Sequence, residues 1–309
     1  MTGATGFVGK AVAQCLQVKP AFNLRSAVRN LGNDSLDHEE KISAIECGTD
    51  WNQALTGTEV VIHAAARAHI IKDEVQDPLA EYRKVNVEGT LNLATQAAQV
   101  GVRRFIFVSS IGVNGNLSSR PFTETDTPCP AEPYAKSKSE AEKGLWDIHR
   151  QTGIDVVIIR SPLVYGPNAP GNFNSLVRWI DRGLPLPLGS IHNKRSLVAL
   201  DNLVDLIITC VDHPAAANQV FLAGDGHDVS TTELLRGVGQ AMGKPARLIP
   251  VPAGMLMFGA SLLGEQVVAQ RLLGSLQVDI SKARNVLGWE PPLSVEEGLR
   301  RCFVSESVS

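Results

Sequence analysis

The chain has 309 residues, a hydrophobic fraction of 44% and a formal net charge of −3. This length suits two domains of roughly 150 residues each, and the composition allows a sizeable core. The net charge indicates neither nucleic acid nor an anionic membrane as a partner, so any basic site must be local. The scattered cysteines form no C-x-x-C pair. We therefore expect a cytoplasmic protein with reduced thiols, without a disulfide framework and without a metal site.

The first half alternates short β-branched runs with helical patterns, which is typical of a parallel sheet covered by helices on both faces. Each predicted strand is almost entirely apolar, as expected for a strand that is buried on both sides. Gly101 and Gly153 follow the last two predicted helices as stop signals. The predicted strands are 24–28, 59–64, 104–109 and 155–160, and the predicted helices are 8–16, 78–99 and 134–151.

After Arg160 the sequence changes to proline- and glycine-rich loops with shorter elements. We predict an α/β fold in which residues 1–165 form a Rossmann-type, doubly wound parallel sheet, rejoined by about 195–222. Residues 166–309 then form a smaller C-terminal substrate-binding lobe. Helical patterns in this half lie at 202–210, 231–242 and 294–301.

The most apolar stretch of the chain is 255–263. A helix needs about 20 apolar residues to cross a bilayer, so this stretch is too short to be a transmembrane segment. We predict that it forms a buried helix.

A glycine motif opens the chain, with the sequence Thr-Gly-Ala-Thr-Gly-Phe-Val-Gly over residues 2–9. Glycines at this spacing permit a tight turn and a close approach of the backbone to a pyrophosphate. The N-terminus of the following helix would bind the phosphate charge. The same spacing also fits a glycine-rich turn that binds no ligand. The residues assigned to cofactor binding are Gly3, Gly6, Phe7, Val8 and Gly9.

A hydrophobic strand normally precedes such a motif, yet only Met1 stands before Thr2. In a doubly wound sheet this first strand is central, and without it the neighbouring strands would lose their cover. We therefore expect an upstream in-frame segment of about five to ten residues, rich in Ile, Leu and Val.

A second motif places Tyr134 and Lys138 four residues apart on a predicted helix, hence on one face. A phenol titrates near 10 in water, and a nearby ammonium would lower its pKa. Ser110, at the end of a predicted strand, can hydrogen-bond a substrate oxygen while Tyr134 transfers the proton. The alternative is a solvated helix, for which the neighbouring Glu140 and Glu142 would be typical surface residues.

Together these residues resemble the extended short-chain dehydrogenase/reductase family of nucleotide-sugar epimerases, dehydratases and 4-ketoreductases. The resemblance covers essentially the whole chain. It implies that Ser110, Tyr134 and Lys138 are catalytic, that Lys138 also contacts the cofactor, and that Asn86 supports the site. His63 is interpreted as a packing residue and not as a base. The segments that carry the resemblance are 63–66, 86–90, 107–115, 133–138, 160–167 and 279–292. The residues that would line the cofactor cleft are Ala64, Ala65 and Ala66.

The choice of cofactor depends on Arg29. Family members that prefer NAD usually place an acid at the end of the second strand to hold the ribose hydroxyls, and Arg29 takes that place here. A guanidinium suits a 2′-phosphate through bidentate pairing, although an arginine facing solvent would also fit. We therefore predict NADP(H) in preference to NAD(H).

The substrate half contains one good anchor for a diphosphate. The segment that begins at Arg195 resembles the family segment whose arginine grips a sugar nucleotide, and Asn174 and Arg271 are weaker candidates. A diphosphate anchor argues against a steroid- or dihydroflavonol-type reductase. We expect a UDP-sugar substrate and a homodimer.

The reaction follows from what surrounds Ser110. Family dehydratases carry Asp-Glu directly after this position, where this chain has Ile111-Gly112, so dehydration is not expected. The family's epimerases often have tyrosine where this chain has Asn114. The runs 63–69 and 109–115 resemble reductases of bacterial surface-polysaccharide (O-antigen) pathways. We predict 4-ketoreduction of a UDP-4-keto-6-deoxy-N-acetylhexosamine, with UDP-sugar 4-epimerisation as the alternative. A third alternative is a non-catalytic NAD(P)-binding regulator, although such proteins usually lose the tyrosine or the lysine.

Overall fold

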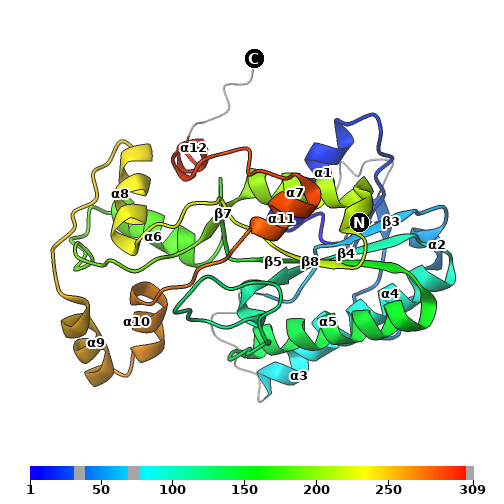
Figure 1. Ribbon diagram of the computed structural model, residues 1–309, viewed down its shortest axis with the longest axis horizontal. Helices are drawn as coiled ribbons and strands as arrows, with labels where there is room; N and C mark the ends of the chain where they lie inside the picture. The colour runs from blue at the N-terminus through cyan, green and yellow to red at the C-terminus, as the bar shows by residue number, and fades with distance from the viewer. Residues whose placement is uncertain (31–38, 69–76, 304–309) are drawn as a thin grey trace.

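The computed structural model describes residues 1–30, 39–68 and 77–303. Its centre is a parallel sheet with helices on both faces (Figure 1), which confirms the predicted α/β fold. β3, β4, β5 and β8 are neighbours in that order, while β1 pairs with β2. The strands are β1 (Ser26–Val28), β2 (Glu39–Lys41), β3 (Val60–His63), β4 (Arg104–Ser110), β5 (Asp155–Ser161) and β8 (Gln219–Leu222).

Met1 and Thr2 join the two groups of strands. Thr2 forms parallel bridges to Ala27 in β1 and His63 in β3. The Thr2 amide donates to the Ile62 carbonyl at 3.0 Å, and the Ala27 amide donates to the Met1 carbonyl at 2.8 Å. These two residues therefore lie where the first strand of a Rossmann sheet belongs, and the upstream segment stays a prediction.

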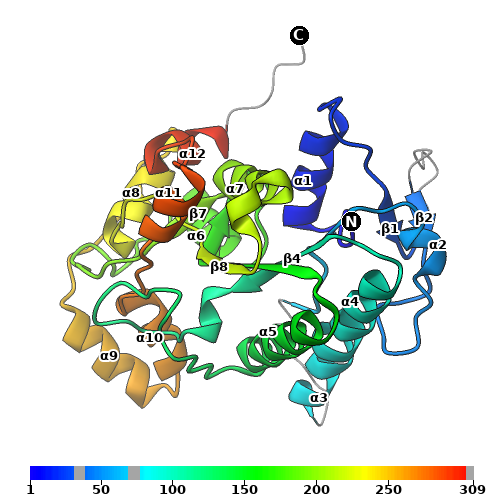
Figure 2. The same ribbon diagram turned by 45° about the vertical axis from the view of Figure 1, so that its right-hand side comes forward.

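Helices cover the sheet in two layers. Figures 1 and 2 show α1, α7 and α11 on one face and α3, α4 and α5 on the other. The first layer packs through residues such as Leu16 and Leu203, and the second through Leu93 and Leu145. The helices are α1 (Phe7–Gln17), α2 (Asn52–Leu55), α3 (Pro78–Arg83), α4 (Thr90–Gln99), α5 (Pro133–Thr152), α7 (Leu200–Asp212) and α11 (Ser281–Leu287).

The predicted helix over 78–99 is not uniform. Between α3 and α4 the segment η1 (Lys84–Gly89) is a π-helix. Such π segments are rare and often mark functional sites, and Asn86 lies within this one. Short 3-10 turns also occur at η2 (Ile111–Val113) and η3 (Pro214–Ala216).

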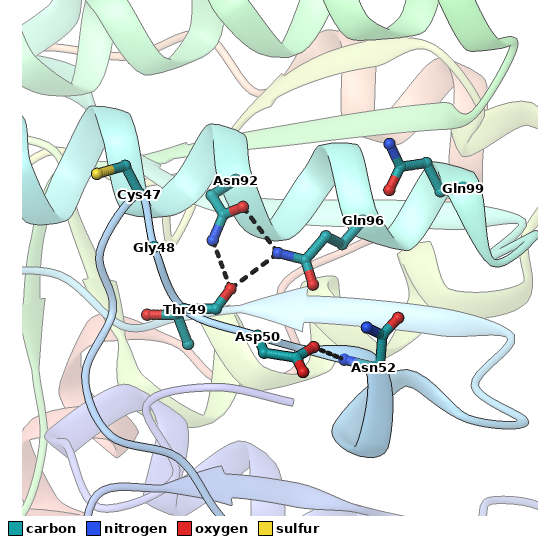
Figure 3. A pocket seen from close by; sticks show the side chains of 8 residues that line it. All are labelled: Cys47, Gly48, Thr49, Asp50, Asn52, Asn92, Gln96 and Gln99. Atoms are coloured by element: carbon teal, nitrogen blue, oxygen red, sulfur yellow. Dashed lines mark hydrogen bonds between the residues drawn. The ribbon is translucent and has the colours of Figure 1, made fainter.

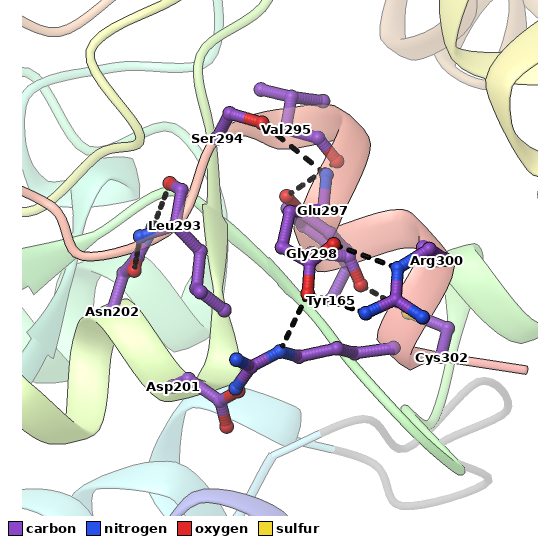
Figure 4. A network of polar contacts seen from close by, with 11 residues as sticks. Tyr165, Asp201, Asn202, Leu293, Ser294, Val295, Glu297, Gly298, Arg300 and Cys302 are labelled. Carbon is purple, nitrogen blue, oxygen red and sulfur yellow. Dashed lines mark hydrogen bonds and ion pairs between the residues drawn. The ribbon is translucent and has the colours of Figure 1, made fainter. Parts of the chain in front are cut away.

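Several elements after β5, here called the small lobe, share an apolar core that includes Phe173, Leu235 and Leu299. The division into domains at residue 165 stays a prediction. Figure 4 shows the polar contacts that link α12 and the residues before it to α7 and Tyr165. The Tyr165 hydroxyl donates to Asp225 at 2.8 Å, and Asn202 exchanges two hydrogen bonds of 2.9 Å with the backbone of Leu293. The elements are β6 (Leu163–Tyr165), β7 (Leu197–Ala199), α6 (Asn172–Asp181), α8 (Thr231–Ala241), α9 (Ala253–Leu262), α10 (Gln266–Leu273) and α12 (Val295–Arg301).

The apolar stretch 255–263 falls mainly in α9, but the prediction that it is buried is wrong. None of the α9 residues is buried, and Phe258 and Leu262 are 69% and 72% exposed. The reason is geometric: apolar residues surround the helix, while α9 lies at the end of the small lobe with α10 as its main neighbour (Figure 2). In the described part of the chain, no helix is long and apolar enough to cross a membrane.

Candidate active site

The glycine loop forms a tight cradle at the carboxyl end of the sheet. Gly3 has φ +78°, and a Cβ there would lie 2.6 Å from the Ala65 amide nitrogen. A Cβ on Gly9 would lie 2.0 Å from the Gly3 carbonyl oxygen. Only glycine fits either position, so the loop lies directly against the start of the Ala64–Ala66 segment. The structure thus brings these predicted cofactor residues together.

Helix α1 begins where this loop ends. Gly6 is its N-cap and offers no side-chain hydrogen bond, and Phe7 and Val8 are its first two residues. The first amide groups of a helix have no partner within the helix, and its dipole makes this end attractive to anions. The geometry therefore suits a pyrophosphate beside the loop.

Arg29 directly follows β1 and is exposed. It stands at the carboxyl end of a parallel strand, which is the edge where such sheets bind ligands. Its preference for a 2′-phosphate stays a prediction.

Ser110, Tyr134 and Lys138 come from two adjacent elements. Ser110 ends β4, and its Oγ accepts a hydrogen bond from the Gly112 amide at 3.1 Å. A Cβ on Gly112 would lie 3.1 Å from the Cβ of Ala135 and 3.4 Å from Ser110 Oγ, so the start of α5 packs against this turn. Lys138 is fully buried, with Nζ 3.7 Å from the ring centre of Phe107 in β4.

The electrostatics of this pair differ from the prediction. Burial raises the pKa of Tyr134 to about 12, and the neighbouring Tyr82 adds to the effect. Burial also lowers the pKa of Lys138 to about 7, while the carboxylate of Glu142 opposes that fall. The predicted lowering of the Tyr134 pKa is therefore wrong for this structure, because burial dominates. At neutral pH Tyr134 is a neutral phenol that can donate a proton.

Asn86 ties the catalytic helix to the segment after β3. It is buried, and its Nδ2 donates to Ser137 Oγ at 3.0 Å and to the Arg67 carbonyl at 3.1 Å. Its Oδ1 accepts from the Arg67 amide at 2.8 Å. Asn86 thus fixes the distance between α5 and the chain that follows Ala66.

A buried polar network behind the site was not predicted. Glu142 forms an ion pair of 2.6 Å with Arg160 and accepts a hydrogen bond of 2.5 Å from Ser109 Oγ. Arg160 also donates to Asn114 Oδ1 at 2.9 Å. Interpreting Glu142 as a surface residue is therefore wrong. The signal was present in the spacing, since Glu142 follows Lys138 by four residues, on the face that carries the catalytic pair.

His63 is enclosed at the sheet centre. Its Nδ1 lies 2.6 Å from Thr2 Oγ1 and its Nε2 lies 2.9 Å from Thr90 Oγ1. Burial lowers the pKa of His63 to about 3, with the charge of Lys138 as the second cause. A neutral ring with both nitrogens engaged fits a packing residue. His69, the other histidine of the run 63–69, lies outside the described residues.

Two of the predicted substrate residues meet. Arg195 Nη1 donates to the carbonyl oxygens of Arg271 at 2.5 Å and Gly274 at 3.2 Å, and burial lowers the pKa of Arg195. Arg271 Nη2 donates to Glu132 Oε1 at 2.5 Å, and Glu132 is the N-cap residue of α5. Asn174 is exposed on α6, and no described hydrogen bond joins it to either arginine.

A cavity of about 660 Å³ separates the loops after β4 from α10. It reaches Glu132 and Arg271, so it lies beside the start of the catalytic helix. This is the best candidate for a substrate site near Tyr134. It is lined by Asn114, Gly115, Asn116, Leu117, Phe122, Asp126, Thr127, Cys129, Ala131, Glu132, Gln270 and Arg271.

A second hollow of about 310 Å³ lies between α4 and the chain before α2 (Figure 3). Asn92 and Gln96 both donate to the Thr49 carbonyl oxygen, at 2.7 and 2.8 Å. Their amides fasten this loop to the helix, so we assign the hollow a structural role. Within the described residues, no group of three or more His, Cys, Asp or Glu could hold a metal ion.

Comparison with known families decides the class of protein. The sequence profile of the NAD dependent epimerase/dehydratase family matches residues 1–224. The chain belongs to this family. The resemblance to extended short-chain dehydrogenases/reductases is thereby confirmed, and the protein is an enzyme of the NAD-dependent epimerase/dehydratase type.

Alignments with named relatives cover nearly the whole chain. UDP-glucose 4-epimerase of Vibrio cholerae is 48% identical over 304 residues, covering 97% of this chain and 93% of that protein. N-acetyl-alpha-D-glucosaminyl-diphospho-ditrans,octacis-undecaprenol 4-epimerase of Escherichia coli O157:H7 is 28% identical and covers 100% and 95%. The structure of UDP-glucose 4-epimerase from Thermotoga maritima with UDP-glucose has a TM-score of 0.75 at 25% identity, covering 98% and 96%.

Proposed function

We propose that this protein is a nicotinamide-dependent 4-epimerase of a UDP-linked hexose or N-acetylhexosamine. The observation that carries the proposal is the 48% identity to a UDP-glucose 4-epimerase over 97% of the chain. The serine at the end of β4 and the tyrosine and lysine on the first turns of α5, beside the cavity that Glu132 lines, support it. This reverses the order expected from the sequence, and 4-ketoreduction becomes the second candidate, favoured by Arg29 and Asn114.

Each group of residues has a distinct role in the proposed reaction. The glycine loop and the start of α1 hold the cofactor pyrophosphate. The bound cofactor supplies reversible hydride transfer at the sugar C4. Tyr134 exchanges a proton with the C4 oxygen, Ser110 donates a hydrogen bond to that oxygen, and Lys138 adds positive charge one turn away. Arg195 and Arg271 provide positive charge for the diphosphate.

A second candidate exists for the group that the diphosphate links to the sugar: a polyprenol in place of uridine. The relative from E. coli O157:H7 is named for a sugar linked to undecaprenol diphosphate. The exposed apolar helix α9 is joined to the cavity wall by α10, which favours a lipid nearby. The UDP-sugar remains the first choice because of the closer relative.

The test is to incubate the enzyme and catalytic cofactor with UDP-glucose or UDP-N-acetylglucosamine and to follow the C4 epimer by NMR. Interconversion without net cofactor oxidation supports the epimerase. Stoichiometric NADPH consumption with a UDP-4-keto-6-deoxy sugar, and no epimerisation, would replace it with the ketoreductase.

The catalytic assignment has its own test. Tyr134→Phe should lower turnover by roughly two orders of magnitude or more, because it removes the group that exchanges the proton. Cofactor binding, measured by calorimetry, should stay unchanged. Near-normal turnover in this variant would show that Tyr134 is not the proton carrier.

A further inference from the structure

Helix α9 combines extreme apolarity with exposure. From Leu248 to Gly264 no residue carries a charge, and Ser261 is the only polar side chain. Met255, Phe258 and Leu262 follow one stripe of the helix and are 66%, 69% and 72% exposed. Leu263, just beyond the helix, is 80% exposed. Exposed apolar patches of this kind mark interaction surfaces.

Basic residues border this patch. The segments 172–190 and 242–265 contain four basic residues and two acidic ones, Glu265 and Asp181, of which Asp181 forms an ion pair of 2.5 Å with Lys244, in a chain whose net charge is −3. The two segments are held together, since the Leu186 amide donates to the Arg247 carbonyl at 2.8 Å. Leu184 and Ile249, 43% and 49% exposed, extend the apolar surface into this region. The basic residues of these segments are Arg178, Arg182, Lys244 and Arg247.

The patch lies next to the candidate site. α10 follows α9 directly, and Gln270 and Arg271 of α10 line the 660 Å³ cavity. Figures 1 and 2 show both helices at the end of the molecule far from α1 and α2. A flat partner that covers α9 would therefore stand beside the cavity and leave the cofactor end free.

We propose that α9 is an interfacial helix that docks the enzyme on an anionic lipid surface. Phe258, Leu262 and Leu263 enter the boundary between headgroups and acyl chains, while Arg182 and Arg247 face anionic headgroups. Apolar side chains bordered by local positive charge match a lipid surface better than a second copy of this chain, which would bring the same positive charge against itself. Docking does not depend on the reaction that is catalysed.

The test measures sedimentation of the full chain with vesicles of phosphatidylcholine alone or mixed with phosphatidylglycerol. The wild type should bind the anionic vesicles, and the double variant Phe258→Asp with Leu262→Asp should bind at least about tenfold more weakly. The matched control, Val18→Asp with Val100→Asp, also replaces exposed valines (79% and 46%) and should bind like the wild type. Arg182→Glu with Arg247→Glu should weaken binding to anionic vesicles only.

Two further measurements keep the result unambiguous. Circular dichroism melting shows whether each variant is folded, which we expect because the changed side chains are exposed. Turnover of a water-soluble UDP-sugar should be unchanged in the α9 variant, so a failure of docking is distinct from a failure of the proposed reaction. The proposal is overturned if the wild type binds neither vesicle, or if the α9 variant binds as well. It is also overturned if light scattering shows an oligomer that the α9 variant dissociates, without vesicle binding.

Discussion

One buried neighbour favours the charged form of Lys138. Burial lowers the pKa of Lys138 to about 7 even though the carboxylate of Glu142, one turn further along α5, opposes that fall. Glu142 is in turn held by Arg160 and Ser109. Because Ser109 adjoins Ser110, the same carboxylate links the helix of Tyr134 to the strand of the catalytic serine. We infer that Glu142 is a positioning residue for the site.

This inference predicts a shift in the pH profile. A protonated Lys138 is present below its pKa and is lost above it, so its loss limits activity on the alkaline side. Glu142→Gln removes the opposing charge, and the alkaline midpoint should move to lower pH by about one unit. The substitution also leaves the buried Arg160 without its ion-pair partner, which lowers the stability of the variant. The midpoint of the pH profile does not depend on the amount of folded enzyme, so it still reports on Lys138. Glu140→Gln, on the exposed side of the helix, is the control and should leave the midpoint in place. An unmoved midpoint in Glu142→Gln would refute the role.

Cofactor preference can be tested at Arg29 alone. Arg29→Asp should weaken NADPH binding far more than NADH binding, because an attractive contact with a 2′-phosphate becomes repulsive. Lys19→Asp makes the same change of charge at an exposed site beyond the end of α1 and should affect neither. Fluorescence titration of both cofactors provides the ratio. Equal effects on NADPH and NADH would show that Arg29 faces solvent.

At the scale of elements, cofactor binding requires the glycine loop to lie directly against the start of α1. In Gly9→Ala the added methyl would lie 2.0 Å from the Gly3 carbonyl oxygen, so the loop would have to move away from the helix. We expect cofactor affinity to fall at least about tenfold. Gly48→Ala is the control, because its methyl meets nothing within 4 Å. Calorimetric titration of both variants checks the prediction, and similar affinities would contradict it.

Most elements could be predicted from their residues because their patterns are local. α5 extends over Pro133–Thr152 where 134–151 was predicted, and it ends at Gly153, which has φ +77° as a stop residue should. β2 was missed because Glu39–Lys41 is polar and lacks a strand pattern. The π-helix around Asn86 was missed because its contacts to Arg67 and Ser137 depend on tertiary structure. The exposure of α9 was missed for a related reason, since apolarity does not reveal what packs against it.

At the scale of the molecule, the candidate site joins distant segments. The glycine loop, Ser110, Tyr134 and Lys138 could be proposed from motifs, because each motif encodes its own local geometry. The pairing of Arg195 with Arg271, and of Arg271 with Glu132, joins residues far apart in the sequence. Nothing in their local patterns indicates those partners. The spacing of Glu142 from Lys138 indicated the face of α5 on which Glu142 lies, but its pairing with Arg160 exists only after β5 and α5 have packed.

The centre of the sheet also predicts how stability depends on pH. His63 connects the first residues of the chain to α4 through Thr2 and Thr90. Its pKa is lowered to about 3 in the folded protein, whereas a free histidine titrates near 6.5. The unfolded chain therefore takes up the proton first. The stability that His63 contributes is fully present above about pH 6.5 and is lost as pH falls towards 3, by at most about 1.4 kcal/mol per pH unit. His63→Gln should lower stability at pH 7.5, because the substitution removes a ring that makes two hydrogen bonds. The stability of this variant should nevertheless fall less steeply towards pH 4.5.

Urea unfolding across this pH range measures both slopes, with His227→Gln in an exposed loop as the control. Equal slopes for wild type and His63→Gln would mean that the protonation of His63 is not what links acidity to unfolding.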